Sequence, residues 1–408
     1  MELLEKVSLK VRLENYWDKI KINRKTSPGN DGIHVYEFER NEKKNLKLIS
    51  NQLLSKTYKV DEPRKKRIPK NKFADTGENR TINIYNIKDK IIQRSIHKEI
   101  KEFFPETINE ISIGFVENGG VRKAVEKVRE LYKKDYLWLT TVDIVDFFES
   151  ININNLEKII YKKLGKDKSL NWLINQCLSV IKNEINIEDK IYTDEEDIET
   201  GVPQGSVLAP FFSNVYMSLF DKTLVKNNIH AIRYADDIAI LSKTKDEAII
   251  NLALVKGLLE KKFGLKIHGE KTKKRPKHYQ LRNEAIFLGL SIKANDKKPW
   301  DISPEKKRIE ENKLAIKILM NRDNLPLYKR FEKINARIIG WYTTYHFVGC
   351  NNYILIKTYS DVRDILENEL SRVLVAKKFI THKINRKQAQ FIGIFKIEQI
   401  MEILSKKN

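Results

Sequence analysis

The sequence contains little cysteine and no long apolar segment. Its 408 residues include only two cysteines, Cys177 and Cys350, which form neither a CxxC pair nor a zinc-binding pattern with histidine. We therefore expect no disulfide scaffold, in keeping with a reducing compartment. No apolar run approaches the roughly 20 residues that a membrane-spanning helix needs. Residues 1–21 mix leucine and valine with charged residues, unlike a signal peptide. These absences predict a soluble, cytoplasmic protein with no membrane partner.

Negative charge is scarce relative to positive charge. The chain carries 77 Lys+Arg against 55 Asp+Glu, which gives a formal net charge of +22 and a sequence pI of about 9.5. Such an excess makes a polyanion such as nucleic acid the first partner to consider. A solvated basic surface is the alternative, and charge alone does not separate the two.

Hydrophobic periodicity divides the chain near residue 300. Before that point, segments with helical spacing alternate with short β-branched runs, and beyond Pro304 the spacing is helical almost to the C-terminus. Residues 1–60 are expected to form two helices joined by the turn-rich segment 27–32. The basic stretch from Pro63 to Lys70 predicts an extended arm or an edge strand, because proline cannot donate a hydrogen bond within a central ladder. Further helices are predicted over 86–104, 152–183, 207–225 and 245–263, and single strands over 81–84, 136–148 and 285–292. Residues 231–242 predict two short strands around Ala235-Asp236, and residues 183–199 predict a hairpin.

The segment Tyr234-Ala235-Asp236-Asp237 places two adjacent carboxylates between apolar strand residues. Burying such charges is costly unless something positive receives them. At the tip of a hairpin the carboxylates leave the hydrophobic layer, and their hard oxygen atoms suit Mg²⁺. For this segment alone, an ordinary acidic turn is the alternative interpretation.

A second acidic segment, Val142-Asp143-Ile144, stands at the end of a predicted buried strand. Asp143 could there face the acidic hairpin tip. Carboxylates on two neighbouring strands can hold two Mg²⁺ ions about 4 Å apart, an arrangement that stabilises the attacking and the leaving oxygens of a phosphoryl transfer. Taken alone, this segment is also compatible with a core strand followed by a capped helix.

The two acidic segments belong to an ordered series of motifs that resembles reverse transcriptases, particularly the bacterial ones related to group II intron proteins. The resemblance covers roughly residues 25–350. It departs from the family pattern at Val116, which follows Gly114-Phe115 where the family has an arginine. The matching blocks are Ser27-Pro28-Gly29-Asn30-Asp31-Gly32, Ile68-Pro69-Lys70 with Arg80, Asp89-Lys90-Ile91-Ile92-Gln93, the Asp143 strand, Gly201-Val202-Pro203-Gln204-Gly205-Ser206, Tyr234-Ala235-Asp236-Asp237, Gly264-Leu265-Lys266 with Glu270-Lys271-Thr272, Phe287-Leu288-Gly289, and Ile338-Ile339-Gly340-Trp341-Tyr342-Thr343-Thr344-Tyr345.

The resemblance implies an α+β fold of the right-hand polymerase type, in which fingers and palm are followed by an all-helical thumb. The palm would contain an antiparallel sheet with helices packed on it. The expected domains are residues 1–105 for the N-terminal helices and fingers, 106–300 for the palm with part of the fingers, 301–375 for the helical thumb, and 376–408 for a basic C-terminal extension.

The resemblance also implies roles for individual residues. Asp143, Asp236 and Asp237 would be catalytic, and two Mg²⁺ ions would be held by Asp143, Asp236 and the backbone carbonyl of Ile144. Phe148 would lie beneath the sugar C2′ and exclude ribonucleotides by its volume. A solvated surface for the basic residues, and core packing for the aromatic ones, are alternatives that stay open. The incoming nucleotide would contact Lys70, Arg80, Phe148, Gln204 and Lys271, and the nucleic acid would contact Arg64, Lys65, Lys66, Arg67, Gly205, Trp341 and Tyr345.

The implied function is RNA-directed DNA polymerisation. The template would be a partner RNA, expected to be a dedicated non-coding RNA, with dNTPs as substrates and DNA as the product. The sequence ends soon after the thumb motif and shows no zinc-binding HNH pattern, which favours an enzyme of bacterial antiphage defence. A maturase-like RNA-binding protein of a group II intron and a retron reverse transcriptase are the alternatives.

Overall fold

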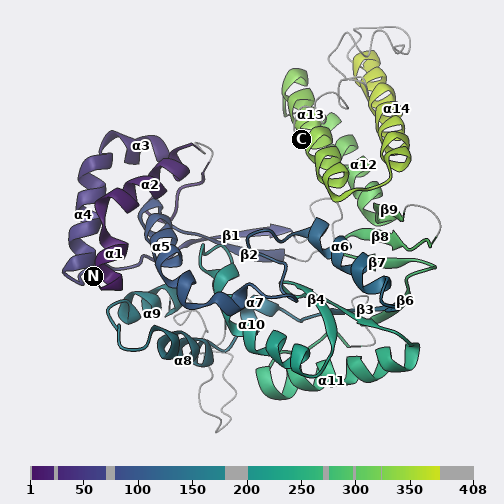
Figure 1. The fold of residues 1–408 in the computed structure, drawn as a ribbon. Coiled ribbons are helices and arrows are strands. Elements are labelled where there is room, and N and C mark those ends of the chain that lie inside the picture. Colours follow the sequence, from purple (N-terminus) through teal and green to yellow (C-terminus); the bar gives the residue numbers. More distant parts are fainter. Residues whose placement is uncertain are drawn as a thin grey trace, which may run out of the picture. The chain divides into compact units, whose positions relative to one another are not determined.

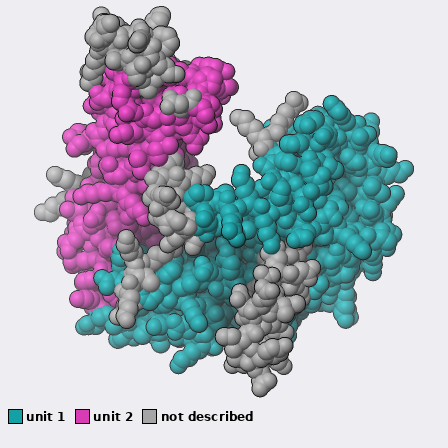
Figure 2. All heavy atoms as spheres, turned by 180° about the vertical axis from the view of Figure 1, so that it is seen from behind, with its two compact units in different colours: residues 1–120, 140–241, 246–277 teal, residues 121–139, 242–245, 278–408 magenta. Residues whose placement is uncertain are grey.

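The computed structural model describes residues 2–22, 26–69, 79–179, 201–269, 275–296, 300–322 and 324–376. The chain forms two compact units, shown in separate colours in Figure 2. Unit 1 comprises residues 1–120, 140–241 and 246–277, and unit 2 comprises residues 121–139, 242–245 and 278–408. The finer division into fingers, palm, thumb and C-terminal extension stays a prediction.

Unit 1 begins with a group of helices whose shared core contains Leu13, Trp17 and Leu46, each 1% exposed or less. Burying side chains of this size removes apolar surface from water and is the main source of stability here. The helices are α1 (Leu3–Ser8), α2 (Lys10–Lys21), α3 (Val35–Arg40), α4 (Glu42–Leu54) and α5 (Ile87–Ile100), and two short 3-10 turns follow at Lys101–Phe103 and Pro105–Thr107.

The prediction of only two helices in residues 1–60 is wrong, because each predicted helix is divided. Leu9 has non-helical backbone angles (φ −55°, ψ 122°) between α1 and α2, and Asn41 (φ −123°, ψ 25°) separates α3 from α4. Apolar residues keep a helix-like spacing across both breaks, so the hydrophobic pattern does not mark them.

A two-stranded antiparallel ribbon follows this helical group. Strand β1 (Arg64–Pro69) pairs with β2 (Asn79–Ile84), with Arg64 opposite Ile84 and Pro69 opposite Asn79. The predicted extended arm and its partner strand are therefore confirmed. Pro69 stands at the end of the ribbon, where a missing N–H donor is tolerated.

The central sheet of unit 1 carries strands β4 (His230–Tyr234), β5 (Asp237–Ser242) and β3 (Trp138–Asp143), hydrogen-bonded in that order. Helix α10 packs against β4 (Figure 1), and the apolar side chains of β5 are almost fully buried. The two short strands predicted within 231–242 are confirmed as β4 and β5, whereas the strand predicted over 136–148 is too long, because β3 ends at Asp143 and the chain turns into helix α7 at Phe147. The helices of this part are α7 (Phe147–Ser150), α8 (Ile153–Leu164), α9 (Asn171–Ser179), α10 (Ala209–Lys226) and α11 (Lys245–Phe263).

The helix predicted over 152–183 is in fact two helices, α8 and α9. Gly165 follows α8 with a positive φ of 64°, a conformation that glycine adopts without a steric penalty and that ends a helix. The hairpin predicted over 183–199 lies outside the described residues.

Unit 2 combines α6 (Val121–Tyr132) with a three-stranded antiparallel sheet and a helical group. The sheet has the order β7 (Ala285–Phe287), β8 (Leu290–Lys293) and β9 (Asp301–Pro304). Helix α6 packs against α13. The remaining elements are the short strand β6 (Lys277–Gln280) at the unit boundary and the helices α12 (Lys306–Met320), α13 (Leu327–Val348) and α14 (Asn352–Ala376).

The single strand predicted over 285–292 is wrong, because this segment folds back as the β7–β8 hairpin. Leu288 (φ 51°) and Gly289 (φ 73°) form its two-residue loop, with both residues in the left-handed region that tight hairpins require. Leucine rarely adopts this conformation, so the apolar run of the sequence conceals the turn.

Two smaller predictions can be compared with the fold. Cys177 and Cys350 are both free and buried. Within the described ranges, none of the helices combines the length and the apolar character that crossing a bilayer requires.

Candidate active site

The acidic turn closes the hairpin between β4 and β5. The last pair of the ladder joins Tyr234 to Asp237, so Ala235 and Asp236 form a two-residue loop. Ala235 lies in the left-handed region (φ 56°), as such loops require, and it is buried. Asp236 and Asp237 are partly exposed. The hairpin thus lifts the acidic side chains out of the apolar layer, as the sequence predicts.

Asp143 is the last residue of β3, and β3 is the neighbour of β5 in the sheet. Its Oδ1 atom lies 3.2 Å from Nε2 of His268, and its carbonyl oxygen accepts the backbone N–H of His268 at 3.1 Å. An isolated antiparallel β-bridge between Ile144 and Ile267 adds a second backbone connection directly after the end of β3. The sheet therefore brings the two predicted acidic segments onto adjacent strands. The sequence analysis did not identify His268.

A buried ion pair lies directly before the acidic turn in the chain. Arg233 on β4 and Asp221 on α10 have side chains that are 0% and 1% exposed. Nε and Nη2 of Arg233 donate to the two carboxylate oxygens of Asp221 at 2.8 Å and 2.6 Å. Asn109 adds a third donor to that carboxylate at 3.0 Å. This pair was not predicted from the sequence, where its signal is an arginine between the apolar Ile232 and the acidic turn.

The segment 111–114 runs beside β4 and packs on the turn. The N–H of Ile113 donates to the carbonyl of Arg233 at 2.9 Å, and the N–H of Arg233 donates to Ile111 at 2.8 Å. A Cβ atom at Gly114 would come within 2.8 Å of the backbone nitrogen of Ala235. Glycine is therefore needed at position 114 for the segment to approach the acidic turn this closely.

The loop 201–206 is held by side chains from other elements. Gln93 on α5 accepts hydrogen bonds from the hydroxyl of Ser206 at 3.2 Å and from the N–H of Val207 at 2.9 Å. Gln204 donates its side-chain amide to Glu149, which follows the Asp143 strand, at 2.6 Å. These bonds join the loop to the predicted block that contains Gln93 and to helix α7, which follows the Asp143 strand.

The same loop also touches the β1–β2 ribbon. The N–H of Asn83 donates to the carbonyl of Gln204 at 2.8 Å. Gly205 has a φ of 103°, and a Cβ atom there would collide with the carbonyl oxygen of Asn83. The close backbone approach that Gly205 permits is therefore to β2, and its contact with a templating base pair stays a prediction.

The basic residues of β1 differ in their surroundings. Lys65, Lys66 and Arg67 are exposed, as is Arg80 on β2. Arg64 is partly buried, and its Nε and Nη2 donate to the carbonyl oxygen of Pro28 at 3.3 Å and 3.0 Å. Arg64 therefore fastens the turn-rich segment 27–32 to the ribbon, while its neighbours are accessible to a polyanion.

Two phenylalanines lie near the acidic strands. Phe148 is partly buried against the core, its ring centroid is 5.3 Å from that of Phe147, and its carbonyl accepts the N–H of Val202 at 2.7 Å. Phe115 is 50% exposed at a positive φ of 59°, with its ring 5.8 Å from that of Tyr234. An exposed bulky residue in this strained conformation suggests a functional constraint. In the sequence, Phe115 belongs to a family motif but receives no functional role.

The aromatic residues of the predicted thumb motif belong to unit 2, on α13. Trp341 packs on Tyr345 with ring centroids 4.5 Å apart, and both are partly buried. Tyr342 is buried, donates its hydroxyl to the carbonyl of Leu355 at 2.7 Å, and stacks edge-on against Tyr359. Burial raises the pKa of Tyr342 above its ordinary value. Contact of Trp341 and Tyr345 with nucleic acid stays a prediction.

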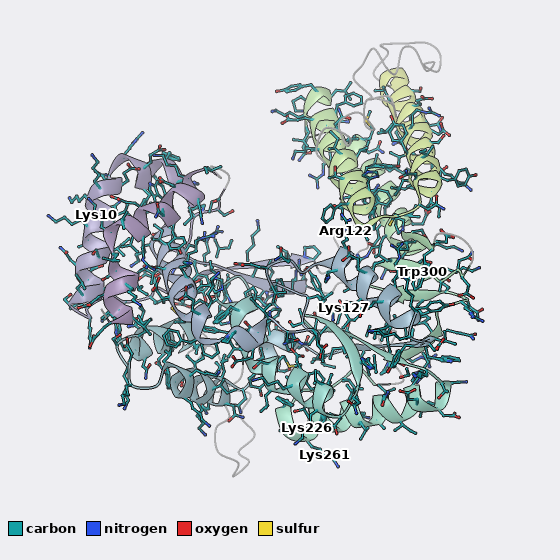
Figure 3. All side chains as sticks on the ribbon, viewed as in Figure 1. Lys10, Arg122, Lys127, Lys226, Lys261 and Trp300 are labelled. Atoms are coloured by element: carbon teal, nitrogen blue, oxygen red, sulfur yellow. The ribbon has the colours of Figure 1, made fainter. Side chains whose placement is uncertain are left out.

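Basic side chains occur in both units, as the five labelled lysines and arginines of Figure 3 show. In unit 1 the labelled Lys10, Lys226 and Lys261 are exposed, and in unit 2 Arg122 is exposed. The positive charge is therefore not confined to β1. Lys70 and Lys271, which the sequence assigns to the incoming nucleotide, lie outside the described residues.

The donor set can be tested against Mg²⁺. Within the described ranges, no three His, Cys, Asp or Glu side chains form a group that could hold a metal ion by themselves. Polymerase sites hold Mg²⁺ by one or two carboxylates together with substrate phosphates and water. Asp143 at the end of β3 and Asp236 in the turn directly before the neighbouring β5 offer hard oxygen donors that fit that requirement.

The fold is of the right-hand polymerase type, with antiparallel sheets accompanied by many helices, and the acidic turn connects two strands of one of these sheets. Residues 68–292, more than half of the chain, match the family described as reverse transcriptase (RNA-dependent DNA polymerase). The chain therefore belongs to the reverse transcriptase family, whose members are RNA-directed DNA polymerases. The predicted family and fold class are confirmed.

Curated relatives agree with this family. The chain is 23% identical to protein YkfC of Escherichia coli (strain K12) over 301 residues, which are 64% of this chain and 75% of YkfC. It is 26% identical to the putative COX1/OXI3 intron 1 protein of Saccharomyces cerevisiae, over 49% of this chain and 23% of that protein. For the group II intron-encoded protein LtrA of Lactococcus lactis subsp. cremoris the identity is 24%, over 44% of this chain and 28% of LtrA. The chain thus spans about a quarter of the two intron-encoded relatives.

Solved structures with detectable similarity include apo telomerase from Candida tropicalis. That comparison gives a TM-score of 0.42 and 12% identity, over 84% of this chain and 65% of the telomerase chain. A partial Cas6-RT-Cas1–Cas2 complex gives a TM-score of 0.35 and 19% identity, over 64% of this chain and 43% of that chain.

Proposed function

We propose that this reverse transcriptase makes DNA on an RNA template by two-metal nucleotidyl transfer at Asp143 and Asp236. The observation that carries the proposal is the placement of Asp143 at the end of β3, next to the strand that begins directly after Asp236. Two carboxylates on adjacent strands, raised out of an apolar sheet, match what in-line phosphoryl transfer requires of a protein.

The roles that we propose for the chain's own residues are those that the family resemblance implies. Asp143, Asp236 and the carbonyl of Ile144 would hold two Mg²⁺ ions, and Asp237 would orient the site from the start of β5. When bound, the ions would stabilise the attacking and leaving oxygens of the transfer. The bonds from His268 keep the end of β3 in place before substrate arrives.

The exposed cations of the β1–β2 ribbon would bind phosphates. Lys65, Lys66, Arg67 and Arg80 are accessible, and the ribbon is fastened to the loop 201–206 through Asn83. Phosphate contacts of this kind supply affinity without sequence recognition. We assign Arg80 and Gln204 to the incoming dNTP, together with Lys70 and Lys271, which lie outside the described residues. We assign Lys65, Lys66, Arg67, Gly205, Trp341 and Tyr345 to the nucleic acid.

The test is nucleotide incorporation by Asp143→Asn and Asp236→Asn. Each change keeps the side-chain volume and removes one shared metal ligand, so we expect incorporation on a primed RNA to fall by at least about a thousandfold, in the range known for essential catalytic groups. The Asp18→Asn variant, altered at an exposed position on α2, is the matched control. Incorporation within tenfold of wild type by either site variant would reject the assignment.

Sugar selection is tested at Phe148. If the ring lies beneath C2′, Phe148→Ala should raise ribonucleotide incorporation relative to deoxynucleotide incorporation by about two to three decades, at about 1.4 kcal/mol per decade. If Phe148 only fills the core, the change should cost about 3–5 kcal/mol of stability and leave the sugar ratio unchanged. Side-by-side dNTP and rNTP assays with a thermal melt separate the two results.

The biological setting remains a prediction of the sequence. We propose a cytoplasmic enzyme of bacterial antiphage defence that copies a dedicated non-coding RNA. Cells that carry the wild-type protein should then resist phage, and cells that carry Asp236→Asn should not. Sequencing the nucleic acid that copurifies with the protein tests the template: one abundant RNA species supports the proposal, and a mixture of cellular RNAs contradicts it.

A further inference from the structure

The guanidinium of Arg233 forms one set of contacts with Asp221 and a second set with Asn214 and Ala235. Nε and Nη2 form a two-bond fork with Asp221, at 2.8 Å and 2.6 Å, in a fully buried setting. Nη1 makes the remaining contacts. It donates to Oδ1 of Asn214 at 3.1 Å and reaches the carbonyl oxygen of Ala235 at 3.5 Å.

The contact with Ala235 matters because of that residue's backbone. Ala235 has a φ of 56°, a left-handed conformation in which the Cβ atom of an L-residue is crowded. Such a conformation persists only where its surroundings determine it. Ala235 immediately precedes Asp236, so the peptide that Arg233 contacts also fixes the direction in which the Asp236 side chain leaves the turn.

Asn214 extends the same network to the segment beside the turn. Its Nδ2 donates to the carbonyl of Gly114 at 2.9 Å, and its Oδ1 accepts the hydroxyl of Ser112 at 3.3 Å as well as Nη1 of Arg233. Gly114 lies directly against the backbone of Ala235. The network therefore holds the acidic turn from two directions, through Arg233 within β4 and through Gly114 beside it.

Stability alone does not account for this arrangement. A buried ion pair loses the hydration of both charges, and replacing such a pair by apolar residues of similar size is often neutral or stabilising. What an apolar pair cannot supply is a planar set of donors with fixed directions. The directional bonds of Arg233 end at the turn that carries Asp236.

We propose that Arg233, oriented by Asp221 and Asn214, is a positioning residue that fixes the Ala235–Asp236 turn so that the Asp236 carboxylate is presented to metal. The inference rests on the proposed function in one respect, namely that Asp236 is a metal ligand. Arg233 is fully buried and acts through the backbone of Ala235 rather than on substrate.

The decisive variant replaces the ion pair by an apolar pair, Arg233→Met with Asp221→Leu, and is compared with wild type and with Asp236→Asn. Three measurements are made on each full-length protein: the thermal melt, the affinity for Mn²⁺ by electron paramagnetic resonance, and the Mg²⁺ concentration that half-saturates dNTP incorporation. The Mn²⁺ measurement needs no turnover.

We expect the double variant to melt close to wild type while its Mn²⁺ affinity falls about tenfold, which corresponds to about 1.4 kcal/mol. The half-saturating Mg²⁺ concentration should rise by a similar factor, and excess Mg²⁺ should restore part of the rate. Arg233→Lys keeps the charge but loses the fork, so it should show a smaller rise in the Mg²⁺ requirement. If the double variant does not fold, Arg233→Lys provides the same readouts.

Wild-type Mn²⁺ affinity and Mg²⁺ dependence in a folded Arg233 variant would overturn the positioning role, provided that Asp236→Asn does lose Mn²⁺. If Asp236→Asn binds Mn²⁺ as wild type does, the assignment of Asp236 as a ligand fails, and the inference fails with it. The reference variant therefore shows which of the two ideas has been rejected.

Discussion

Each unit of the molecule contains a large buried arginine, and the two arginines are satisfied in different ways. Arg233 in unit 1 is 0% exposed and forms an ion pair with Asp221, whereas Arg330 in unit 2 is 2% exposed and donates to the carbonyls of Met320 and Leu325, both at 2.8 Å. Met320 is the last residue of α12, so Arg330 satisfies a carbonyl that the helix itself leaves without a partner.

The comparison shows how one residue type serves different purposes. The carbonyl partners of Arg330 lie 5 and 10 residues away in the chain, and they join the end of α12 to the start of α13. The partners of Arg233 come from a different helix, and the arginine reaches a turn that carries carboxylates. These bonds of Arg330 close a helix connection in unit 2, and those of Arg233 hold a turn that carries two carboxylates in unit 1.

The largest expected effect comes from removing these arginines singly. Arg233→Ala leaves the Asp221 carboxylate buried without its cation and should lower the free energy of unfolding by about 3–5 kcal/mol. Arg330→Ala leaves backbone carbonyls with fewer donors and should lower it by about 1–3 kcal/mol. Denaturant unfolding of both variants measures the difference. An effect of Arg330→Ala that equals or exceeds that of Arg233→Ala would contradict the distinction between the units.

Unit 1 contains a second buried carboxyl group, that of Asp89. Its hydrogen-bond partner is the phenol of Tyr58, whereas the partner of Asp221 is an arginine. The hydroxyl of Tyr58 donates to Oδ1 of Asp89 at 2.6 Å, and both residues are 1% exposed. Burial raises the pKa of Asp89 to about 7. The unfolded value is about 3.9, so the folded state holds the proton more tightly than the unfolded state does.

Because the pKa of Asp89 is higher in the folded state, its contribution to the free energy of unfolding decreases as the pH rises. The contribution of the protonated Asp89 is fully present below the unfolded pKa and is lost as the pH rises through the folded pKa, which is about 7. Asp89→Asn cannot titrate, so its melting temperature relative to wild type should increase from pH 5 to pH 8. The exposed Asp18→Asn is the control for general charge effects. A difference between Asp89→Asn and wild type that does not vary with pH would show that Asp89 does not titrate in this range.

The smallest effect on stability is expected when the exposed cations of β1 are replaced, because they lack the burial of the Arg233–Asp221 pair. Changing Lys65, Lys66 and Arg67 together to Gln should leave the melting temperature within a few degrees and reduce the salt dependence of RNA binding. Each phosphate contact contributes a slope of about 0.7–0.9, so the loss should be about two units. Arg64→Gln is the control, because Arg64 lies on the same strand but is partly buried.

Because Arg64 binds the carbonyl of Pro28, its replacement should lower stability more than it lowers the salt slope. The binding measurement is a titration of labelled RNA over a range of salt concentrations. An unchanged slope in the triple variant would make these three residues a solvated surface.

The local parts of the site were predicted from the sequence because their signals are local. The acidic hairpin tip, the strand ending at Asp143 and the ribbon at 64–69 were all expected, and the structure contains them. A turn and its flanking strands are specified by residues that are neighbours in the sequence, so the sequence pattern is sufficient to predict them. The β7–β8 hairpin was missed because Leu288 occupies a turn position that usually belongs to glycine or asparagine.

The sequence by itself determined the reverse transcriptase family, the acidic turn and the order of the motifs, since each depends on residues that stand next to one another. Only the tertiary structure decided which residues hold that turn. Asp221 and Asn214 lie 12 and 19 residues from Arg233, and Asn109 lies 112 residues from Asp221. Such partners meet because α10 packs against β4 and the segment 111–114 runs beside it. Burial, which follows from that packing, makes these few hydrogen bonds strong enough to position a carboxylate.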